Sequence, residues 1–444
     1  MSGRYLSLYY GSLDARRAAV LLGGWLTAPF ALRRRREAAL AHEVRAHLGD
    51  ATADVFAYAS ARGALAAVLR AAGIGPGDEV LLSAFTCLAV PTAVLAAGGE
   101  PRYVDIDPET MNVPAEKLIE AIGPKVRAVV VQHTMGSVAE VDEIVAACRA
   151  RGILVVEDCA LALGSTDAGR PVGSRADAAI FSMELSKTLS TGWGGVLAVR
   201  HAPVAEAVAA QRIALPRRSC FAAARDTLQI IVTGAAYQRQ LFFIGRYLVA
   251  LGFRLGLFRG STPAAEIDGR PAADFMAPLG KAQLMLAAHQ WRRLPSVASA
   301  SAANMGALRS ALEAAGLATL GAPRAGDTAV SPRISFVADD RDRTIAWFAR
   351  EGVEVGTWFD GPLTPVPTTA AFAFDAAQFP QAAALARRVV NLPAHVGVDA
   401  ADRARLTRLI ARFARERREP EAARSISSPS GLDTGGAKHV PPVA

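Results

Sequence analysis

The feature that most constrains the fold is a regular alternation of two kinds of segment between about residue 50 and residue 200. Short apolar runs rich in β-branched residues alternate with stretches of helical periodicity. Such an alternation predicts an α/β fold with a mostly parallel sheet, in which ligands bind beyond the carboxyl ends of the strands. The strand-like runs are residues 79–82, 101–106, 128–132, 153–156, 178–182 and 196–199, and the helical stretches are 63–72, 91–97, 114–122 and 141–150.

Three positions beside these segments carry residues with suggestive chemistry. The helix expected from about Gly63 begins with small residues, and free N–H groups at such a helix start attract an anion such as phosphate. Asp158 follows the run at 153–156; taken alone, it is better explained as a helix cap or a solvated strand end. Ser182 ends the run at 178–182, and Lys187 follows five residues later, before a cluster of glycines.

A phosphate cradle, an acid and a lysine are together what pyridoxal phosphate needs. The lysine forms a Schiff base with the aldehyde, the carboxylate keeps the pyridine nitrogen protonated, and amides with hydroxyls hold the phosphate. Lys187 is therefore the candidate that carries the cofactor, and the glycines after it would let the backbone pass close to the bound ring.

Further motifs occur in a set order from about residue 57 to residue 415. They are SARGAL, GDEV, DIDP at a strand end, ED after a buried strand, FS followed by the lysine, and NLP with a histidine. In order and spacing these motifs resemble the DegT/StrS-type family of nucleotide-sugar aminotransferases. The resemblance implies a fold type I pyridoxal phosphate transferase: a large domain with a mostly parallel sheet flanked by helices, and a smaller C-terminal α+β domain.

The resemblance also implies a domain organisation and a set of site residues. We expect an N-terminal arm with helices (1–50), a large cofactor-binding domain (51–295) with an apolar basic insertion (217–262), a small domain (296–416) and a disordered tail (417–444). Lys187 is implied as Schiff-base lysine and proton shuttle, and Asp158 as the partner of the pyridinium. For His133, a role near the cofactor and ordinary hydrogen bonding remain open. The expected cofactor-binding residues are Arg62, Gly63, Cys87, His133, Asp158, Ser182 and Lys187.

Several positions depart from the family pattern. Cys87 stands where an aromatic residue commonly stacks on the ring, with Phe85 two residues earlier, and Leu161 and Leu163 replace an expected glutamine and histidine. The block GYNYRMSE, through which the partner subunit usually supplies polar groups, appears here as PAADFMAP, in which only Met276 is retained.

Two functions therefore stay open. The resemblance implies a homodimeric aminotransferase that moves an amino group, usually from glutamate, to a nucleotide- or lipid-linked keto-sugar for polysaccharide, glycolipid or secondary-metabolite synthesis. Lysine at position 187 favours transamination, since the family's sugar dehydratases carry histidine there. The alternative is a degenerate, non-catalytic member that serves as a binding or regulatory subunit at a membrane.

Composition limits the partners. Four cysteines lie scattered without metal-ligand spacing, which indicates reduced thiols in a cytoplasmic protein and no metal site. The formal net charge of +8 is modest for 444 residues but uneven, and the arginine-rich stretches could be a basic patch for nucleic acid, anionic lipid or a phosphorylated substrate, or solvated helix faces. Of these partners we do not expect nucleic acid. The apolar stretch at 18–32 is followed by four arginines and is too short to span a bilayer.

The segment 227–260 has no counterpart in the family pattern. It is strongly apolar, but Arg239, Arg246 and Arg254 interrupt it at spacings of seven and eight, which places them within about 80° on one helix. Two interpretations remain: a helix lying on the inner face of the membrane, or a helical hairpin buried in the dimer interface or over the active site.

Overall fold

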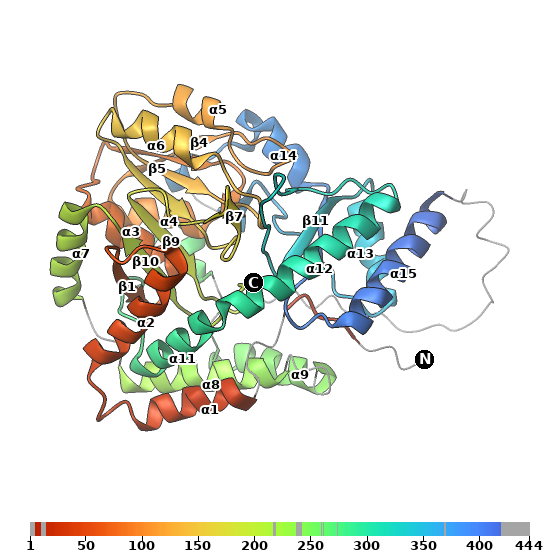
Figure 1. Cartoon of the computed structure of the whole chain (residues 1–444), viewed down its shortest axis with the longest axis horizontal. Helices are drawn as coiled ribbons and strands as arrows, with labels where there is room; N and C mark the ends of the chain where they lie inside the picture. Colours follow the sequence, from red (N-terminus) through yellow and green to blue (C-terminus); the bar gives the residue numbers. More distant parts are fainter. Residues whose placement is uncertain are drawn as a thin grey trace.

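The computed structural model describes residues 5–9, 15–215, 219–236, 242–258, 260, 262–272, 274–367 and 370–418. These residues form a larger body around a seven-stranded sheet and a smaller C-terminal body beside it, on the left and right of Figure 1. Of the tail predicted from residue 417, everything from residue 419 onward lies outside the described residues.

The central sheet confirms the predicted α/β fold with a mostly parallel sheet. Its strand order is β1-β10-β9-β6-β5-β2-β4. The pairs β1–β10 and β10–β9 are antiparallel, and the other four neighbouring pairs are parallel. The strands are β1 (Asp54–Tyr58), β2 (Glu79–Ser83), β4 (Glu100–Val104), β5 (Val126–Gln132), β6 (Leu154–Asp158), β9 (Ala178–Ser182) and β10 (Gly195–Val199).

Both faces of this sheet are covered, which explains why its strands are apolar throughout. In β9, Ile180 belongs to the same core cluster as Leu65 of α3, whereas its neighbour Phe181 packs edge-on against Trp291 of α11, with ring centroids 5.2 Å apart. The helices of this body are α2 (Arg33–Leu48), α3 (Ala61–Ala71), α4 (Ala89–Ala97), α5 (Ala115–Glu120), α6 (Val141–Arg149), α7 (Ala202–Ala214) and α11 (Lys281–Arg292).

The C-terminal body has its own core and a small antiparallel sheet. Strand β11 (Arg333–Val337) pairs with β13 (Val389–Pro393), and the long helix α12 (Leu294–Ala314) leads into this body. Its other helices are α13 (Arg341–Arg350), α14 (Pro380–Ala386) and α15 (Ala400–Arg418). The N-terminal arm joins the same body, since Leu6 forms a β-bridge with Val353.

A short parallel pairing joins the two bodies near the carboxyl edge of the large sheet. Strand β3 (Thr86–Cys87), just after β2, pairs with β12 (Leu363–Thr364) from the C-terminal body. The remaining short elements are β7 (Thr166–Asp167), β8 (Arg170–Pro171), α10 (Ala264–Ile267), and the 3-10 helices η1 (Ala370–Phe372) and η2 (Ala376–Gln378).

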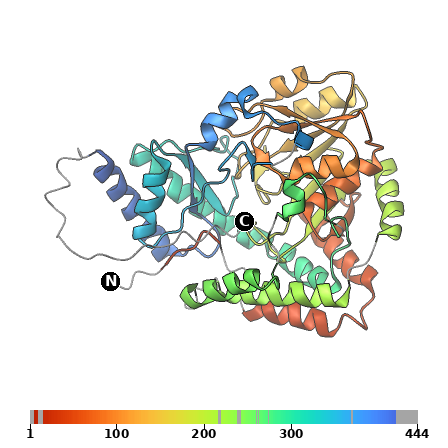
Figure 2. The same ribbon diagram turned by 180° about the vertical axis from the view of Figure 1, so that it is seen from behind.

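Three helices form a separate layer along one edge of the molecule, at the bottom of both Figure 1 and Figure 2. We call α1 (Ala15–Leu26), α8 (Cys220–Ala236) and α9 (Phe242–Arg254) the outer layer. Leu21 and Ile230 fix α1 and α8 to α11, and α9 crosses α8 closely, since a Cβ on Gly245 would lie 2.3 Å from the Ala236 Cα.

The segment 227–260 therefore contains parts of two helices. Of the predicted arginine stripe, Arg239 lies outside the described residues, and the Arg246 side chain is likewise not described. Among the described residues, no helix combines the length and hydropathy of a membrane-spanning segment.

Candidate active site

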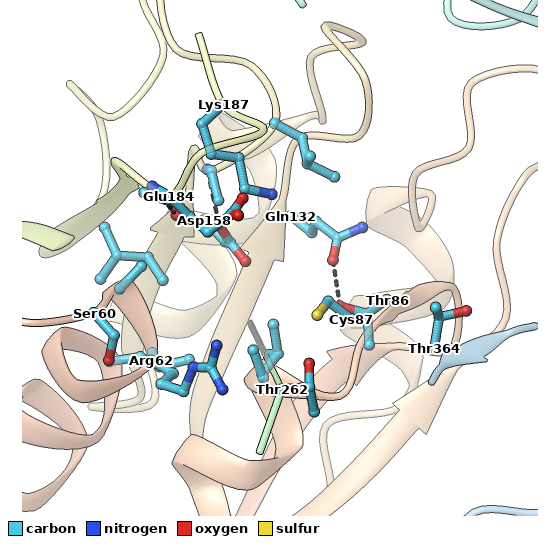
Figure 3. A pocket seen from close by; sticks show the side chains of 18 of the residues that line it. Ser60, Arg62, Thr86, Cys87, Gln132, Asp158, Glu184, Lys187, Thr262 and Thr364 are labelled. Atoms are coloured by element: carbon cyan, nitrogen blue, oxygen red, sulfur yellow. Dashed lines mark hydrogen bonds between the residues drawn. The ribbon is translucent and has the colours of Figure 1, made fainter. Parts of the chain in front are cut away.

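A pocket opens beyond the carboxyl ends of β5, β6 and β9, where the α/β pattern predicts a ligand site (Figure 3). It encloses about 980 Å³ of empty space, including solvent at its mouth, which suits a cofactor with a small substrate. The lining side chains come from the three strand ends, from the start of α3, from β3 and β12, and from the loop around Trp358. Five predicted residues line it: Arg62, Cys87, Asp158, Ser182 and Lys187.

Asp158 ends β6 on the pocket floor. Its Oδ1 accepts a hydrogen bond from the Ala160 N–H at 2.9 Å, and the residue is 5% exposed. Burial raises the pKa of this carboxyl, whereas the Ala160 N–H and the charge of Lys187 oppose that rise. Its register partner on β5 is Gln132, whose side chain faces the same pocket.

Lys187 lies in the turn that follows β9. The turn is closed by a hydrogen bond from the Lys187 N–H to the Glu184 carbonyl at 3.1 Å, and the Lys187 Nζ lies 4.8 Å from the centroid of the Trp358 ring. Burial lowers the pKa of Lys187; Glu184 opposes this, and the charge of Arg333 reinforces it. A lowered pKa increases the fraction of neutral, nucleophilic amine.

The start of α3 lies at the other end of the pocket. Ser60 caps the helix, because its Oγ accepts a hydrogen bond from the Gly63 N–H at 3.1 Å. Arg62 lines the pocket and forms an ion pair with Glu266, a residue that sequence reasoning did not identify. Gly63 is not among the lining residues, and a Cβ there would lie 2.1 Å from the Phe275 carbonyl oxygen. The glycine is thus needed for close packing against the Phe275 segment.

The side chains of β3 form one wall. Cys87 lines the pocket, whereas Phe85 is fully buried and contacts Phe359 edge-on, with centroids 5.0 Å apart. Thr86 donates a hydrogen bond from Oγ1 to Gln132 Oε1 at 2.5 Å, and Gln132 Nε2 donates to the Phe85 carbonyl at 2.9 Å. These bonds fix the wall opposite Lys187.

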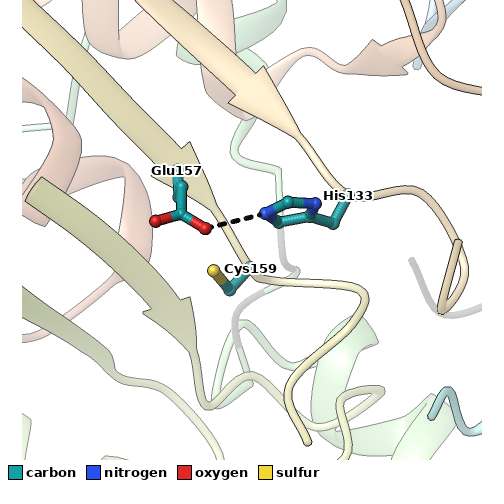
Figure 4. A group of neighbouring side chains, drawn as sticks. All are labelled: His133, Glu157 and Cys159. Carbon is teal, nitrogen blue, oxygen red and sulfur yellow. Dashed lines mark hydrogen bonds and ion pairs between the residues drawn. The ribbon is translucent and has the colours of Figure 1, made fainter. Parts of the chain in front are cut away.

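His133 is fully buried and is not among the pocket-lining residues (Figure 4). Its Nε2 lies 3.2 Å from Glu157 Oε2, and its Nδ1 accepts the Ala139 N–H at 3.1 Å. Burial acts to raise the pKa of Glu157. His133 and the N–H groups of Ala176 and Arg175 outweigh this effect and lower the pKa to about 2. The ligand atoms of His133, Glu157 and Cys159 lie within 4.8 Å of one another, but these hydrogen bonds already use the imidazole and the carboxylate. The histidine makes ordinary hydrogen bonds in this structure, which favours the second of the two interpretations.

Two tryptophans and one arginine complete the surroundings of the lysine. Trp193 and Trp358 both line the pocket, and the Arg333 guanidinium carbon lies 4.4 Å from the Trp358 ring and 5.2 Å from the Tyr9 ring. Arg333 is 1% exposed, and its Nε and Nη2 are buried without a hydrogen-bond partner among the described residues. It belongs to β11, far away in sequence, and no motif marks it.

The glycines after Lys187 pack mainly against protein. A Cβ on Gly192 would lie 2.1 Å from Ile230 of α8, and one on Gly195 would lie 2.4 Å from the backbone of Ala61. Gly194, by contrast, lines the pocket, so only this glycine is placed where the sequence analysis expected the backbone to approach a ring.

Comparison with known proteins identifies this architecture. Residues 15–223 match the DegT/DnrJ/EryC1/StrS aminotransferase family. Among curated proteins, the chain is 43% identical to the protein MosB of Rhizobium meliloti over 152 residues, 34% of this chain and 30% of MosB. It is 40% identical to the GDP-perosamine synthase of Caulobacter vibrioides over 134 residues, 30% of this chain and 36% of that protein.

Solved structures extend the likeness beyond the matched region, as a likeness of fold. The PMP form of the putative sugar aminotransferase Spr1654 from Streptococcus pneumoniae is 19% identical, with a TM-score of 0.68 over 90% of this chain and 97% of that chain. The curated relatives, by comparison, are matched over only about a third of their length. The match assigns residues 15–223, just under half of the chain, to the DegT/DnrJ/EryC1/StrS aminotransferase family, and the rest of the chain shares the fold of the solved structures.

Proposed function

We propose that the protein is a pyridoxal-phosphate-dependent aminotransferase that moves an amino group, with glutamate as the expected donor, to a keto-sugar linked to a nucleotide or a lipid. The observation that carries the proposal is that Lys187 and Asp158 line one pocket, at the strand ends where such a fold binds its ligand. The name of the Caulobacter relative, GDP-perosamine synthase, supports a nucleotide-linked sugar as the substrate class.

The donor set of the pocket fits this cofactor. Bound pyridoxal phosphate supplies an aldehyde that exchanges amino groups and a ring that withdraws electrons when its nitrogen is protonated. Asp158 would hold the proton on the ring nitrogen, because a buried carboxylate stabilises an adjacent cation strongly. Lys187 would bind the aldehyde and then move a proton at the reacting carbon, for which its lowered pKa is suited.

The phosphate end of the pocket has several donors. Among the described residues, the Ser182 Oγ accepts only a long bond from the Glu184 N–H at 3.5 Å, which leaves its hydroxyl hydrogen available to a phosphate oxygen. Arg62 lines the same pocket, but its charge is already balanced by Glu266. We therefore assign the phosphate chiefly to Ser182 and to the N–H groups at the start of α3, with Arg62 shared between the phosphate and Glu266.

The remaining parts of the proposal concern assembly. We propose a cytoplasmic homodimer whose active sites lie near the subunit interface, and a domain boundary near residue 295, where α12 leads into the C-terminal body. We also propose that the region 227–260 makes a peripheral contact with the inner face of the membrane.

The test is the visible absorption spectrum of the purified protein after incubation with pyridoxal phosphate. A lysine-bound cofactor absorbs in the visible range, and transamination predicts that added glutamate abolishes this absorbance with release of 2-oxoglutarate. A panel of nucleotide-linked keto-sugars, each added after glutamate, should then identify the acceptor as the compound that restores the absorbance. A protein that takes up no cofactor at all would instead support the non-catalytic alternative.

A further inference from the structure

The outer layer exposes an unusual amount of apolar side chain. Phe221 of α8 is 79% exposed, and Ile244 of α9 is 67% exposed. Single exposed apolar residues are normal on a protein surface, but a contiguous set over neighbouring helices marks an interaction surface. Large exposed apolar residues occur in all three helices, in the segment after α1 and in the segment after α9. They are Leu22, Trp25, Leu26, Phe30, Leu32, Phe221, Leu228, Ile244, Tyr247, Leu248, Leu251, Leu255 and Leu257.

Helix α9 shows that this exposure follows a pattern. Its exposed apolar residues Ile244, Leu248 and Leu251 recur at spacings of four and three, the period of one helix face. Other residues of α9 make its contacts within the chain. Gly245 packs on Ala236 of α8, and Val249 belongs to a cluster with Ala236 and Phe258. The outward face is thus apolar although packing within the chain does not require it.

The exposed charged side chains described in the outer layer are all positive. Its single carboxylate among the described side chains, Asp226, is 1% exposed. Arg16 and Arg254 are exposed, and so are Arg34 and Arg35 at the start of α2, just after the turn that ends α1. Apolar residues bordered by arginines, with no exposed carboxylate among the described side chains of the layer, match the interface of an anionic lipid bilayer.

We propose that the outer layer, including α1 as well as α8 and α9, is a lipid-docking surface that lies in the plane of an anionic bilayer. This inference deepens the membrane contact proposed above, by naming the surface and the lipid charge that it takes. With 13 residues, α9 is about 20 Å long, too short to cross the hydrocarbon core and suited to lie along it. A second copy of the chain would be expected to offer carboxylates to these arginines, and the described surface of the layer offers none to a symmetric partner.

The layer is also connected to the pocket. Only seven residues separate Arg254, the end of α9, from Thr262, which lines the pocket, and Glu266 shortly afterwards pairs with Arg62. A helix held in the bilayer surface would therefore bring the mouth of the pocket near the lipid head groups. If the aminotransferase proposal holds, this location suits a keto-sugar carried on a lipid phosphate, whose sugar enters while its chains stay in the bilayer.

The test is co-sedimentation of the full chain with vesicles. Native protein should sediment with phosphatidylglycerol-containing vesicles at low salt and much less with phosphatidylcholine alone. The triple variant Ile244→Ser, Leu248→Ser, Leu251→Ser should lower the bound fraction about tenfold or more, because it removes three exposed apolar side chains from one face. The matched control is Ile213→Ser, which changes an 88% exposed residue on α7, outside the layer, and should bind like native protein.

Gel filtration of the same variants separates the two possible occupants of the face. Under our proposal the triple variant keeps the native oligomeric state and loses only vesicle binding. Native protein that stays in the supernatant, or a triple variant that sediments like native protein, would overturn the proposal. A triple variant that becomes monomeric would assign the face to a second copy. Transamination assayed without vesicles is independent of all these results, so failure of the aminotransferase proposal would be recognised separately.

Discussion

The strands of the large sheet and the helices of the outer layer are both rich in apolar residues, but the structure places these residues in opposite surroundings. Leu197 of β10 is 0% exposed, whereas Leu248 of α9 is 53% exposed. The sheet buries its side chains between two layers of helices, and its strand ends then present Asp158, Ser182 and, after a short turn, Lys187 to one pocket.

The difference teaches that an apolar pattern alone does not separate a residue that stabilises the fold from one that meets a partner. Substitutions at the sheet and its strand ends should change chemistry or stability. Substitutions on the exposed face of the outer layer should change neither chemistry nor stability. They should change only the association of the protein with a bilayer. The following experiments test this separation, from the largest expected effect to the smallest.

Lys187→Ala should cause the largest loss. Turnover should fall at least about 10³-fold, since the residue is proposed both to bind the cofactor aldehyde and to move the proton. The visible absorbance of lysine-bound cofactor should disappear while the circular dichroism spectrum stays native. Lys281→Ala is the matched control, because Lys281 of α11 is not among the pocket-lining residues and donates a hydrogen bond to the Ala28 carbonyl beside the outer layer. Comparable losses in both variants would remove the distinction between the regions.

Asp158→Asn should lower turnover by roughly 10²-fold and retain bound cofactor, because a neutral amide occupies the same space but does not stabilise a protonated ring nitrogen. The measurement is steady-state kinetics alongside the absorbance of the bound cofactor. A variant with native turnover would show that the buried carboxylate of Asp158 is a structural group only.

Glu157→Gln tests the opposite side of the same strand and should affect stability instead of chemistry. The carboxylate accepts the N–H groups of Gly173, Arg175 and Ala176 and contacts His133, so the substitution should cost about 2–4 kcal/mol. The folded pKa of Glu157, about 2, lies below its ordinary value of 4.5. Its stabilisation is therefore fully present above about pH 4.5 and is lost as the pH falls toward 2. Urea titrations between pH 3 and pH 7 should show this loss in native protein and less of it in the variant.

Arg333→Met should change the titration of Lys187. The charge of Arg333 helps to lower the pKa of Lys187, so its removal should raise that pKa and shift lysine reactivity to higher pH. The measurement is the pH dependence of labelling of Lys187 by an amine-specific reagent in cofactor-free protein, read by mass spectrometry. Glu184, Asp158 and Cys87 face the same amine and remain in place, and Lys281 serves as the internal reference. An unchanged profile would limit Arg333 to packing between Trp358 and Tyr9.

The sheet was predictable from sequence for a simple reason. Strands buried on both faces are short, continuous apolar runs, and the run expected at 178–182 coincides with β9. The edge strand β1 was missed, because Asp54 is exposed and its next two residues are only half buried, which removes the continuous apolar signal. The contribution of the segment 227–260 to two helices, α8 and α9, was predicted only by the hairpin alternative.

The pocket was predictable where its residues follow a strand locally, and not where distant segments meet. Asp158, Ser182 and Lys187 are of this local kind. The sequence analysis named His133 but not its neighbour Gln132. Successive strand residues face opposite sides of a sheet, so only one of the two could share the pocket with Asp158, and it is Gln132. Arg333 carries no motif, and its approach to Trp358 depends on how the C-terminal body packs on the sheet.

The smallest effect is expected for Leu248→Ser, and it tests the comparison most directly. Leu197→Ala removes a fully buried side chain from β10 and should lower the free energy of unfolding by about 2–5 kcal/mol, through lost burial and a cavity. Leu248 already lies half in solvent, so its replacement should change the free energy of unfolding by no more than about 0.5 kcal/mol. Both values follow from urea titrations at equal protein concentration, without vesicles. If Leu248→Ser destabilised the protein as much as Leu197→Ala, the outward face of α9 would be covered in solution by a second copy. A near-zero change, with weakened sedimentation on anionic vesicles, would show that this face serves an external surface and not the fold.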